Sequence, residues 1–237
     1  MATSKVLLLD IGNRQLKTKF ASLCSAFDWR EQKELDRFSS YLAKCDFELL
    51  AFASSAPQID EKVLALIEPY SLREISSATI PMLIESEGTG VDRLLTTYAA
   101  HAKSQSAAIV VDLGTAFTID VVSGDGVFIG GAIGPGLGTQ IAALKSVAPH
   151  LAAPAELPAN VVIPQSTSNA VFAGTIQSLA IAIQKLVLSY QQQLGESTTV
   201  FLCGGDASKL QGHLPQYQLE ENLLFEGMQL VLRGMAE

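Results

Sequence analysis

The stretch "AIVVDLGTAFTIDVVSGDGVFIGGAI" (Ala108–Ile133) decides the fold that we expect for this chain. It begins as an apolar run typical of a buried strand, and the run ends at the carboxylate of Asp112. Gly114 follows two residues later, and after a threonine-containing turn a second apolar run begins at Thr118. This order predicts a buried strand, a tight glycine turn and an antiparallel partner strand.

A shorter copy of the same pattern lies near the N-terminus, in "KVLLLDIGNRQLKTKFA" (Lys5–Ala21). Its apolar run ends at Asp10, and Gly12 takes the place that Gly114 has in the other copy. Strand and helix patterns follow both copies in a similar order, so we interpret the two turns as equivalent points of a duplicated α/β domain. The predicted lobes are residues 1–104 and 105–237.

Hydrophobic periodicity predicts the remaining elements. We expect strands near residues 6–9, 16–21, 48–53, 74–75, 82–84, 108–112, 118–123, 127–129 and 199–203. We expect helices near residues 28–44, 59–67, 92–103, 139–146, 169–194 and 223–235. The third strand of the second copy, at residues 127–129, is expected to lead into the glycine-rich segment "GGAIGPGLG".

Composition narrows the class of protein. Hydrophobic residues make up 48% of the 237 residues and charged residues 17%, which is typical of a globular chain. The net charge of −8 and the lack of a basic cluster argue against a nucleic-acid binder and against attachment to an anionic membrane surface. No segment is expected to approach the apolar length of a membrane span, and the three cysteines form no CxxC pair that would indicate zinc. We therefore expect a soluble, cytoplasmic protein.

The two turns carry groups that suit a nucleotide polyphosphate. Glycine lets backbone N–H groups approach a phosphate, and the Asn13 amide and the Thr115 and Thr118 hydroxyls can donate hydrogen bonds to phosphate oxygens. A carboxylate at each strand end can hold a cation that bridges phosphates. Two such turns facing each other would bind ATP, with "VFLCGGDASKL" as a wall against adenosine. The alternative is that both turns are purely structural.

The arrangement resembles the actin-like ATPase superfamily, and within it the motifs resemble type III pantothenate kinase, whose family includes Bvg accessory factor homologues. The motifs, in order, are "DIGN" (residues 10–13), "GVDR" (90–93), "DLGTAFTID" (112–120), "GGAIGPGL" (130–137) and "FLCGGDA" (201–207). The resemblance implies a duplicated actin-like (ribonuclease H-like) two-lobe α/β fold, with mixed sheets and an ATP cleft between the lobes.

The resemblance also implies an activity. Type III pantothenate kinases transfer the γ-phosphoryl group of ATP to pantothenate, giving 4'-phosphopantothenate, which is the first step of coenzyme A biosynthesis. The expected cofactors are Mg²⁺ with ATP and a monovalent cation, K⁺ or NH₄⁺. The expected assembly is a cytoplasmic homodimer that binds neither nucleic acid nor membrane.

Site residues follow from the motifs one by one. The matched ATP-binding positions are Asp10, Ile11, Gly12, Asn13, Arg14, Gln15, Leu16, Lys17 and Thr115. The matched substrate-binding positions are Gly90, Val91, Asp92, Arg93 and Thr167, the last acting in the family from the neighbouring subunit. The resemblance makes Asp92 the proton acceptor and Asp112 the ligand of the monovalent cation. Without the resemblance, Asp92 and Arg93 would read equally well as a charged pair at a helix N-terminus.

Two positions depart from the family pattern. Arg14 stands where a threonine is usual, so one hydroxyl donor is lost and a charge is gained. Leu83 stands where a tyrosine often lines the substrate pocket. These departures leave open a kinase for another small hydroxyl substrate, and a non-catalytic regulatory relative is a further alternative.

Overall fold

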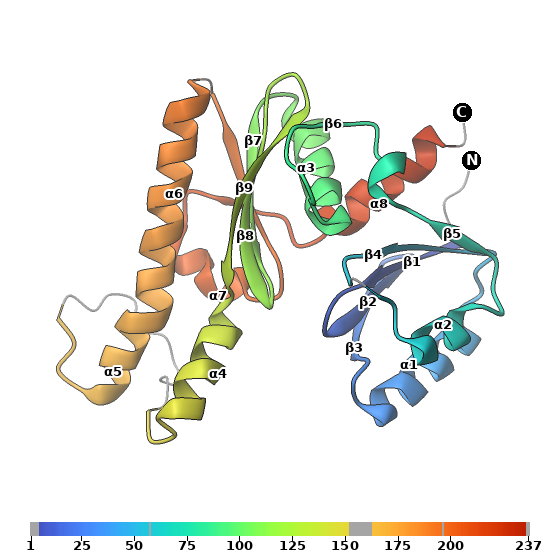
Figure 1. Cartoon of the computed structure of the whole chain (residues 1–237), viewed down its shortest axis with the longest axis horizontal. Helices are drawn as coiled ribbons and strands as arrows, with labels where there is room; N and C mark the ends of the chain where they lie inside the picture. Colours follow the sequence, from blue (N-terminus) through green and yellow to red (C-terminus); the bar gives the residue numbers. More distant parts are fainter. Residues whose placement is uncertain (1–4, 57, 152–162, 196, 236–237) are drawn as a thin grey trace. The chain divides into compact units, whose positions relative to one another are not determined.

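The computed structural model describes residues 5–56, 58–151, 163–195 and 197–235, and it divides into two compact units, each with its own sheet (Figure 1). The first unit consists of Met1–Pro81, Gly88–Thr96 and Leu224–Glu237. The second consists of Met82–Glu87 and Thr97–Leu223. The division into lobes at residue 104 stays a prediction. The compact units are not continuous in sequence, because the C-terminal helix belongs to the same unit as the N-terminal strands.

The sheet of the first unit has the strand order β3-β2-β1-β4-β5. Its strands are β1 (Val6–Ile11), β2 (Gln15–Phe20), β3 (Leu23–Asp28), β4 (Leu49–Ser54) and β5 (Leu72–Glu74). Strand β1 is central, antiparallel to β2 and parallel to β4. Helices α1 (Gln32–Lys44) and α2 (Glu61–Ile67) lie on one face of this sheet (Figure 1).

The core of the first unit forms between this sheet face and α1. Leu35, Phe38 and Leu42 are the buried residues of α1, at the spacing of one helical face. They join Leu9 and Ile11 of β1 in one apolar cluster. Successive strand residues point to opposite faces, so Asp10 lies on the face away from this core.

The prediction that the first helix begins at Asp28 is wrong. Leu23–Asp28 forms the third strand, paired with β2 over its whole length from Phe20↔Leu23 to Gln15↔Asp28. Ala21, with a φ of 52°, makes the sharp turn between the two strands. The helix begins only after Glu31. The end of β3, at Asp28, pairs with the start of β2, at Gln15.

The sheet of the second unit has the order β11-β10-β7-β8-β9-β6. Its strands are β6 (Leu83–Ile84), β7 (Ala108–Leu113), β8 (Ala116–Val122), β9 (Val127–Pro135), β10 (Thr199–Cys203) and β11 (Gln218–Leu219). The order β9-β8-β7-β10-β11 repeats the order β3-β2-β1-β4-β5 of the first unit, and β7 has the central place that β1 has there. The predicted duplication is therefore visible in the topology.

The remaining helices are α3 (Val91–Ser104), α4 (Leu137–Val147), α5 (Thr167–Phe172), α6 (Ser178–Leu194), α7 (Ala207–Leu210) and α8 (Leu223–Gly234). Short 3-10 turns occupy η2 (Ser77–Thr79) and η4 (Gln211–His213), and a π-helical turn, η3 (Ala173–Gln177), joins α5 to α6. Helix α6 lies along one face of the second sheet (Figure 1).

Strand β9 is longer than predicted, because the glycine-rich segment that follows residue 129 is strand as far as Pro135. Gly131 shows why glycine is needed within a strand here. A Cβ atom at this position would lie 1.9 Å from the carbonyl oxygen of Ile119 on the neighbouring strand. The glycines that resemble loop residues in the sequence therefore allow two strands to approach closely.

One continuous helical segment, Thr167–Leu194, is long and apolar enough to cross a membrane by length and composition, with a mean hydropathy of 1.6 in its 18-residue window. The expectation that no segment approaches the length of a span is wrong for this helix. Core helices pass the same test, and Leu179, Ile183 and Val187 of this helix are buried in the core of the second unit.

We predict that Gly227→Ala destabilises the first unit. A Cβ atom at Gly227 in α8 would lie 2.2 Å from the carbonyl oxygen of Leu95 in α3, so the two helices would have to separate. Overpacking of this kind costs about 1–3 kcal/mol, which outweighs the roughly 1 kcal/mol by which alanine favours a helix interior. Urea denaturation measures the change in the free energy of unfolding.

The control is Gly234→Ala at the end of the same helix, where a Cβ atom would meet no atom within 4 Å. We expect this variant to unfold at the wild-type urea concentration. Equal stability of Gly227→Ala and wild type would contradict the close packing of α8 on α3.

Candidate functional site

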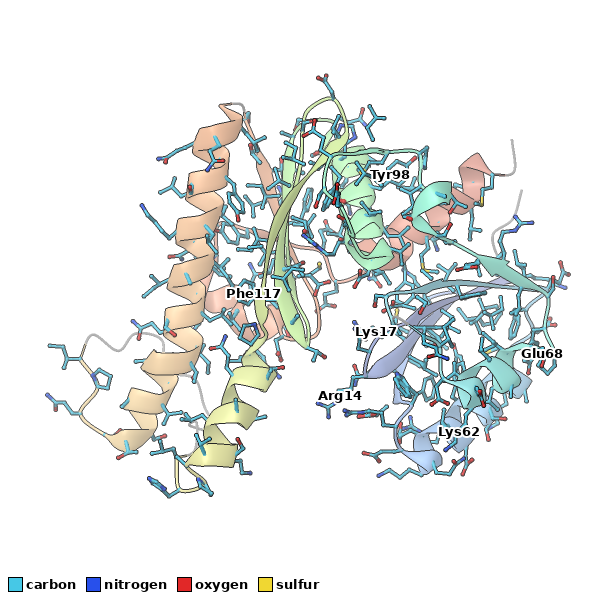
Figure 2. The ribbon with its side chains drawn as sticks, in the orientation of Figure 1. Arg14, Lys17, Lys62, Glu68, Tyr98 and Phe117 are labelled. Atoms are coloured by element: carbon cyan, nitrogen blue, oxygen red, sulfur yellow. The ribbon has the colours of Figure 1, made fainter. Side chains whose placement is uncertain are left out.

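The first turn joins β1 to β2 and closes with a backbone hydrogen bond from Gly12 N to Gln15 O of 3.0 Å. Asp10, the next-to-last residue of β1, is buried and stands directly opposite Lys17 on β2. The three residues between Gly12 and Leu16 are exposed, and Lys17 is half-buried. Arg14 projects from the tip of this hairpin and Lys17 from β2 (Figure 2). The turn thus presents cationic side chains and an open backbone.

Residues at the end of β3 hold this turn in place. Trp29 Nε1 donates a hydrogen bond of 2.9 Å to the carbonyl oxygen of Gly12. Arg14 Nε donates to Asp28 Oδ2 at 3.1 Å, and Arg30 donates to both oxygens of the same carboxylate. None of Asp28, Trp29 and Arg30 is among the site residues predicted from the sequence, because this segment was expected to be helical.

Asp28 is the acid of this group whose pKa is strongly lowered. Hydrogen bonds from Arg30 and, to a lesser degree, from Arg14 hold the pKa of its carboxyl far below the ordinary value, against the opposing effect of burial. A guanidinium has five N–H donors, and the bond to Asp28 uses one of those on Arg14. With two arginines around one carboxylate, the end of this hairpin keeps a net positive charge that suits an anion.

The second turn joins β7 to β8 and closes with a hydrogen bond from Gly114 N to Ala116 O of 3.1 Å. Asp112, the next-to-last residue of β7, is half-buried and stands opposite Thr118 on β8. Thr115 is exposed, and its carbonyl oxygen accepts hydrogen bonds from Gly136 N at 3.0 Å and from Thr139 Oγ1 at 2.6 Å. The "GGAIGPGL" motif therefore supports the backbone of the second turn.

The "FLCGGDA" motif packs against the same carboxylate. Strand β10 runs parallel to β7, with Cys203 opposite Asp112, and Gly204 follows with a φ of 93°. This backbone conformation favours glycine, and a Cβ atom there would lie 2.4 Å from Asp112 Oδ1. Three of the motifs singled out in the sequence thus meet around Asp112.

Asp92 and Arg93 lie in the first turn of α3 and are half-buried. Asp92 Oδ1 accepts a hydrogen bond of 2.9 Å from the backbone N–H of Arg93. A Cβ atom on Gly90 would lie 2.5 Å from the same oxygen, so the glycine before the helix makes room for the carboxylate. An acidic side chain in the first turn of a helix interacts favourably with the positive end of the helix dipole.

The units carry the expected site residues separately. Residues 10–17 and 90–93 belong to the first unit, and Asp112, Thr115 and Thr167 to the second. Thr167 is exposed at the start of α5, where Ser166 caps the helix by accepting a hydrogen bond from Asn169 N. Among the residues that the structure describes, no three His, Cys, Asp or Glu side chains form a metal cage. Magnesium that binds through nucleotide phosphates needs only one or two protein carboxylates, so it does not require such a cage.

Comparison with known proteins agrees with this geometry. A family model described as type III pantothenate kinase matches residues 6–189, a range that includes both turns and the start of α3. A type III pantothenate kinase of Helicobacter pylori strain 26695 is 30% identical over 229 residues, which cover 96% of this chain and 91% of the relative. The enzyme of strain HPAG1 is 37% identical with the same coverage.

Solved structures show the fold. A Campylobacter jejuni protein described as a Baf family transcriptional activator superposes with a TM-score of 0.72 at 19% identity, covering 97% of this chain and 98% of the other. The Alp12 filament structure gives a TM-score of 0.59 at 12% identity, with 98% and 100% coverage. The fold is the duplicated actin-like α/β fold that the sequence indicates. With a family model spanning both of its turns and enzymes of that family aligning along nearly its whole length, this chain belongs to the type III pantothenate kinases.

Proposed function

We propose that this protein transfers the γ-phosphoryl group of ATP to the hydroxyl of pantothenate and forms 4'-phosphopantothenate. The observation that carries the proposal is the match to the family model over one continuous range, residues 6–189. This range includes the turns after Asp10 and Asp112 and the motif that contains Asp92. Such a kinase requires ATP as the phosphoryl donor and a divalent metal ion as a cofactor. Phosphoryl transfer depends mostly on positioning and on neutralising negative charge, and both turns offer groups for these tasks.

In this proposal, each of the two turns contributes groups that bind the nucleotide. The first turn contributes residues 10–17, where exposed backbone and the charges of Arg14 and Lys17 neutralise phosphate oxygens. The second turn contributes Thr115, which is exposed and has a well-supported backbone. Arg14 replaces the hydroxyl of the usual threonine with charge, and its bond to Asp28 limits the positions that its guanidinium can take.

Asp112 binds the monovalent cation, K⁺ or NH₄⁺, that accompanies the nucleotide. Its carboxylate lies at a strand end between Gly114 and Gly204, both without a side chain that would block an ion. When bound, the cation supplies positive charge beside the phosphates as charge moves toward the leaving group.

Asp92 is the proton acceptor. Its Oδ1 is oriented by the Arg93 backbone N–H, so that the carboxylate can orient the substrate hydroxyl and take its proton late in the transfer. The guanidinium of Arg93 has the planar fork that suits the substrate carboxylate. Gly90 and Val91 complete this part of the substrate site.

We further propose a homodimer in which Thr167 contacts the substrate bound to the neighbouring subunit. Ile181 and Leu188 are exposed on the same face of α6, two helical turns apart. They offer apolar surface for such an assembly. The net charge of −8 argues against binding to nucleic acid or to an anionic membrane surface, and we propose that the protein is cytoplasmic.

A coupled kinase assay with pantothenate, ATP and Mg²⁺ tests the function. ADP release that requires pantothenate is the expected result. Leu83 is 73% exposed on the edge strand β6, where a tyrosine is usual in the family, so the assay should include a panel of other small alcohols. Turnover with another alcohol only would identify a different substrate, and no turnover with any alcohol would indicate a regulatory relative.

We predict that Asp92→Asn lowers kcat by about 10²–10⁴, the usual contribution of a positioned proton acceptor. The amide cannot accept the proton, whereas the backbone hydrogen bond from Arg93 can still form. Affinity for ATP, measured by isothermal titration calorimetry, should stay at the wild-type value. The matched control is Asp125→Asn in the exposed turn between β8 and β9. Near-normal turnover of Asp92→Asn would remove this residue as the acceptor.

Replacing potassium by sodium as the sole monovalent cation should lower kcat/KM by about tenfold or more, because one neutralising ion is lost from a phosphoryl-transfer site. Initial rates at constant ionic strength measure this effect, with ammonium as a positive control. Equal rates in sodium and potassium would contradict the role of Asp112.

A further inference from the structure

Asp120 is a fully buried carboxylate for which the reaction proposed above has no role. It closes the "DLGTAFTID" motif, its exposed fraction is 0%, and burial of an ionised group is costly unless hydrogen bonds compensate. One of its partners is Thr118, whose Oγ1 donates a hydrogen bond of 2.7 Å to Asp120 Oδ2. This distance is that of a well-formed hydrogen bond from a hydroxyl to an oxygen acceptor.

The strand register places this pair beside Asp112. Thr118 stands directly opposite Asp112, and Asp120 stands opposite Val110, two residues deeper along the same strands. Residues paired across two strands, and residues two apart on one strand, project from the same face of the sheet. The side chains of Asp112, Thr118 and Asp120 therefore share one face, opposite to the face on which Ile119 packs in the apolar core.

The three side chains differ in their exposure to solvent. Asp112 and Thr118 are half-buried, whereas Asp120 lies beneath them and is closed off. Strand β9 covers Asp120, because a Cβ atom on Gly131 would lie 2.9 Å from its Oδ1. A ligand can reach Asp112 and Thr118 on this face, but it cannot reach Asp120.

The hydrogen bond fixes what the Thr118 hydroxyl can do. A hydroxyl has one proton and two lone pairs, and an ionised carboxylate only accepts. Since the proton of Thr118 points to Asp120, its oxygen has only lone pairs for any ligand. The sequence-based expectation that Thr118 donates to a phosphate therefore does not hold. Its oxygen would repel a phosphate and attract a cation.

We propose that Asp120 is a positioning residue that makes Thr118 Oγ1 an oxygen ligand, together with the Asp112 carboxylate, for the monovalent cation. The inference rests on the proposed function in placing that cation at Asp112. The donor set fits, because K⁺ takes oxygen ligands and NH₄⁺ needs hydrogen-bond acceptors. The two threonines of the turn then differ in role: Thr115 faces the phosphates and Thr118 faces the cation.

The test measures cation binding apart from catalysis. A non-hydrolysable ATP analogue with Mg²⁺ is titrated into the full-length protein at increasing potassium, at constant ionic strength with tetramethylammonium, by isothermal titration calorimetry. Four variants are compared with wild type: Thr118→Val, Thr118→Ser, Asp120→Asn and Thr175→Val. The last is the matched control, because the buried Thr175 hydroxyl donates to Val171 O within a helix of the same unit.

We expect the potassium concentration for half-maximal enhancement of analogue binding to rise by about tenfold or more in Thr118→Val, since one ligand to a charged group is lost. Asp120→Asn should raise it by a smaller factor, because the amide still accepts from Thr118 but no longer carries charge. Thr118→Ser and Thr175→Val should keep the wild-type midpoint. Melting temperatures without potassium report any purely structural loss in each variant.

A wild-type potassium midpoint in Thr118→Val would overturn the inference, and so would analogue binding by wild type that does not depend on potassium. These outcomes are distinct from failure of the proposed function. An active pantothenate kinase with potassium-independent nucleotide binding would leave the function standing without the inference. A chain without kinase activity whose nucleotide binding needs potassium and Thr118 would leave the inference standing without the function.

Discussion

The cross-strand register of two hairpins, with Asp10 opposite Lys17 and Asp112 opposite Thr118, is the constraint on which the rest of the structure depends. In each hairpin, alternate residues of the central strand enter an apolar core, so a slip of one residue would turn the whole apolar set outward. The cores of Leu9 and Ile11 in one unit, and of Val111 and Leu113 in the other, therefore fix which face receives the carboxylate. The energy that positions these polar groups comes mainly from apolar packing behind them.

The same framework supports opposite electrostatic environments. Around the first turn, Lys17, Arg14 and Arg30 outnumber the carboxylates of Asp10 and Asp28, and the surface suits an anion. The second turn presents a carboxylate and a hydroxyl whose proton is already engaged, and its surface suits a cation. A duplicated unit has thus specialised through the residues of its polar face, while the order of the five shared strands stayed the same in both copies.

The strands that end in carboxylates could be predicted from the sequence, because short apolar runs that stop at a charged residue and a glycine have few other interpretations. Strand β3 could not, since "LCSAFD" carries little apolar alternation and lies next to the strong helical pattern of α1. Strand β9 was also misjudged, because its glycines serve a close approach that appears only when the neighbouring strand is in place. The bond from Arg14 to Asp28 and the orientation of the Thr118 hydroxyl depend on contacts between strands, which a single sequence does not display.

Because of the π-helical turn at Ala173–Gln177, the length of the long helical segment does not alone decide in which direction its residues point. A turn of this type contains one residue more than an α-helical turn, and each residue advances an α-helix by about 100°. In an uninterrupted α-helix one extra residue would rotate α5 relative to α6 by that angle, whereas the wider π turn takes up the extra residue within a single turn. A related chain one residue shorter here, with an ordinary α-helical turn, would therefore present nearly the same sides of α5 and α6. The π turn thus allows this segment to differ in length by one residue while Thr167 keeps its direction relative to the core face of α6.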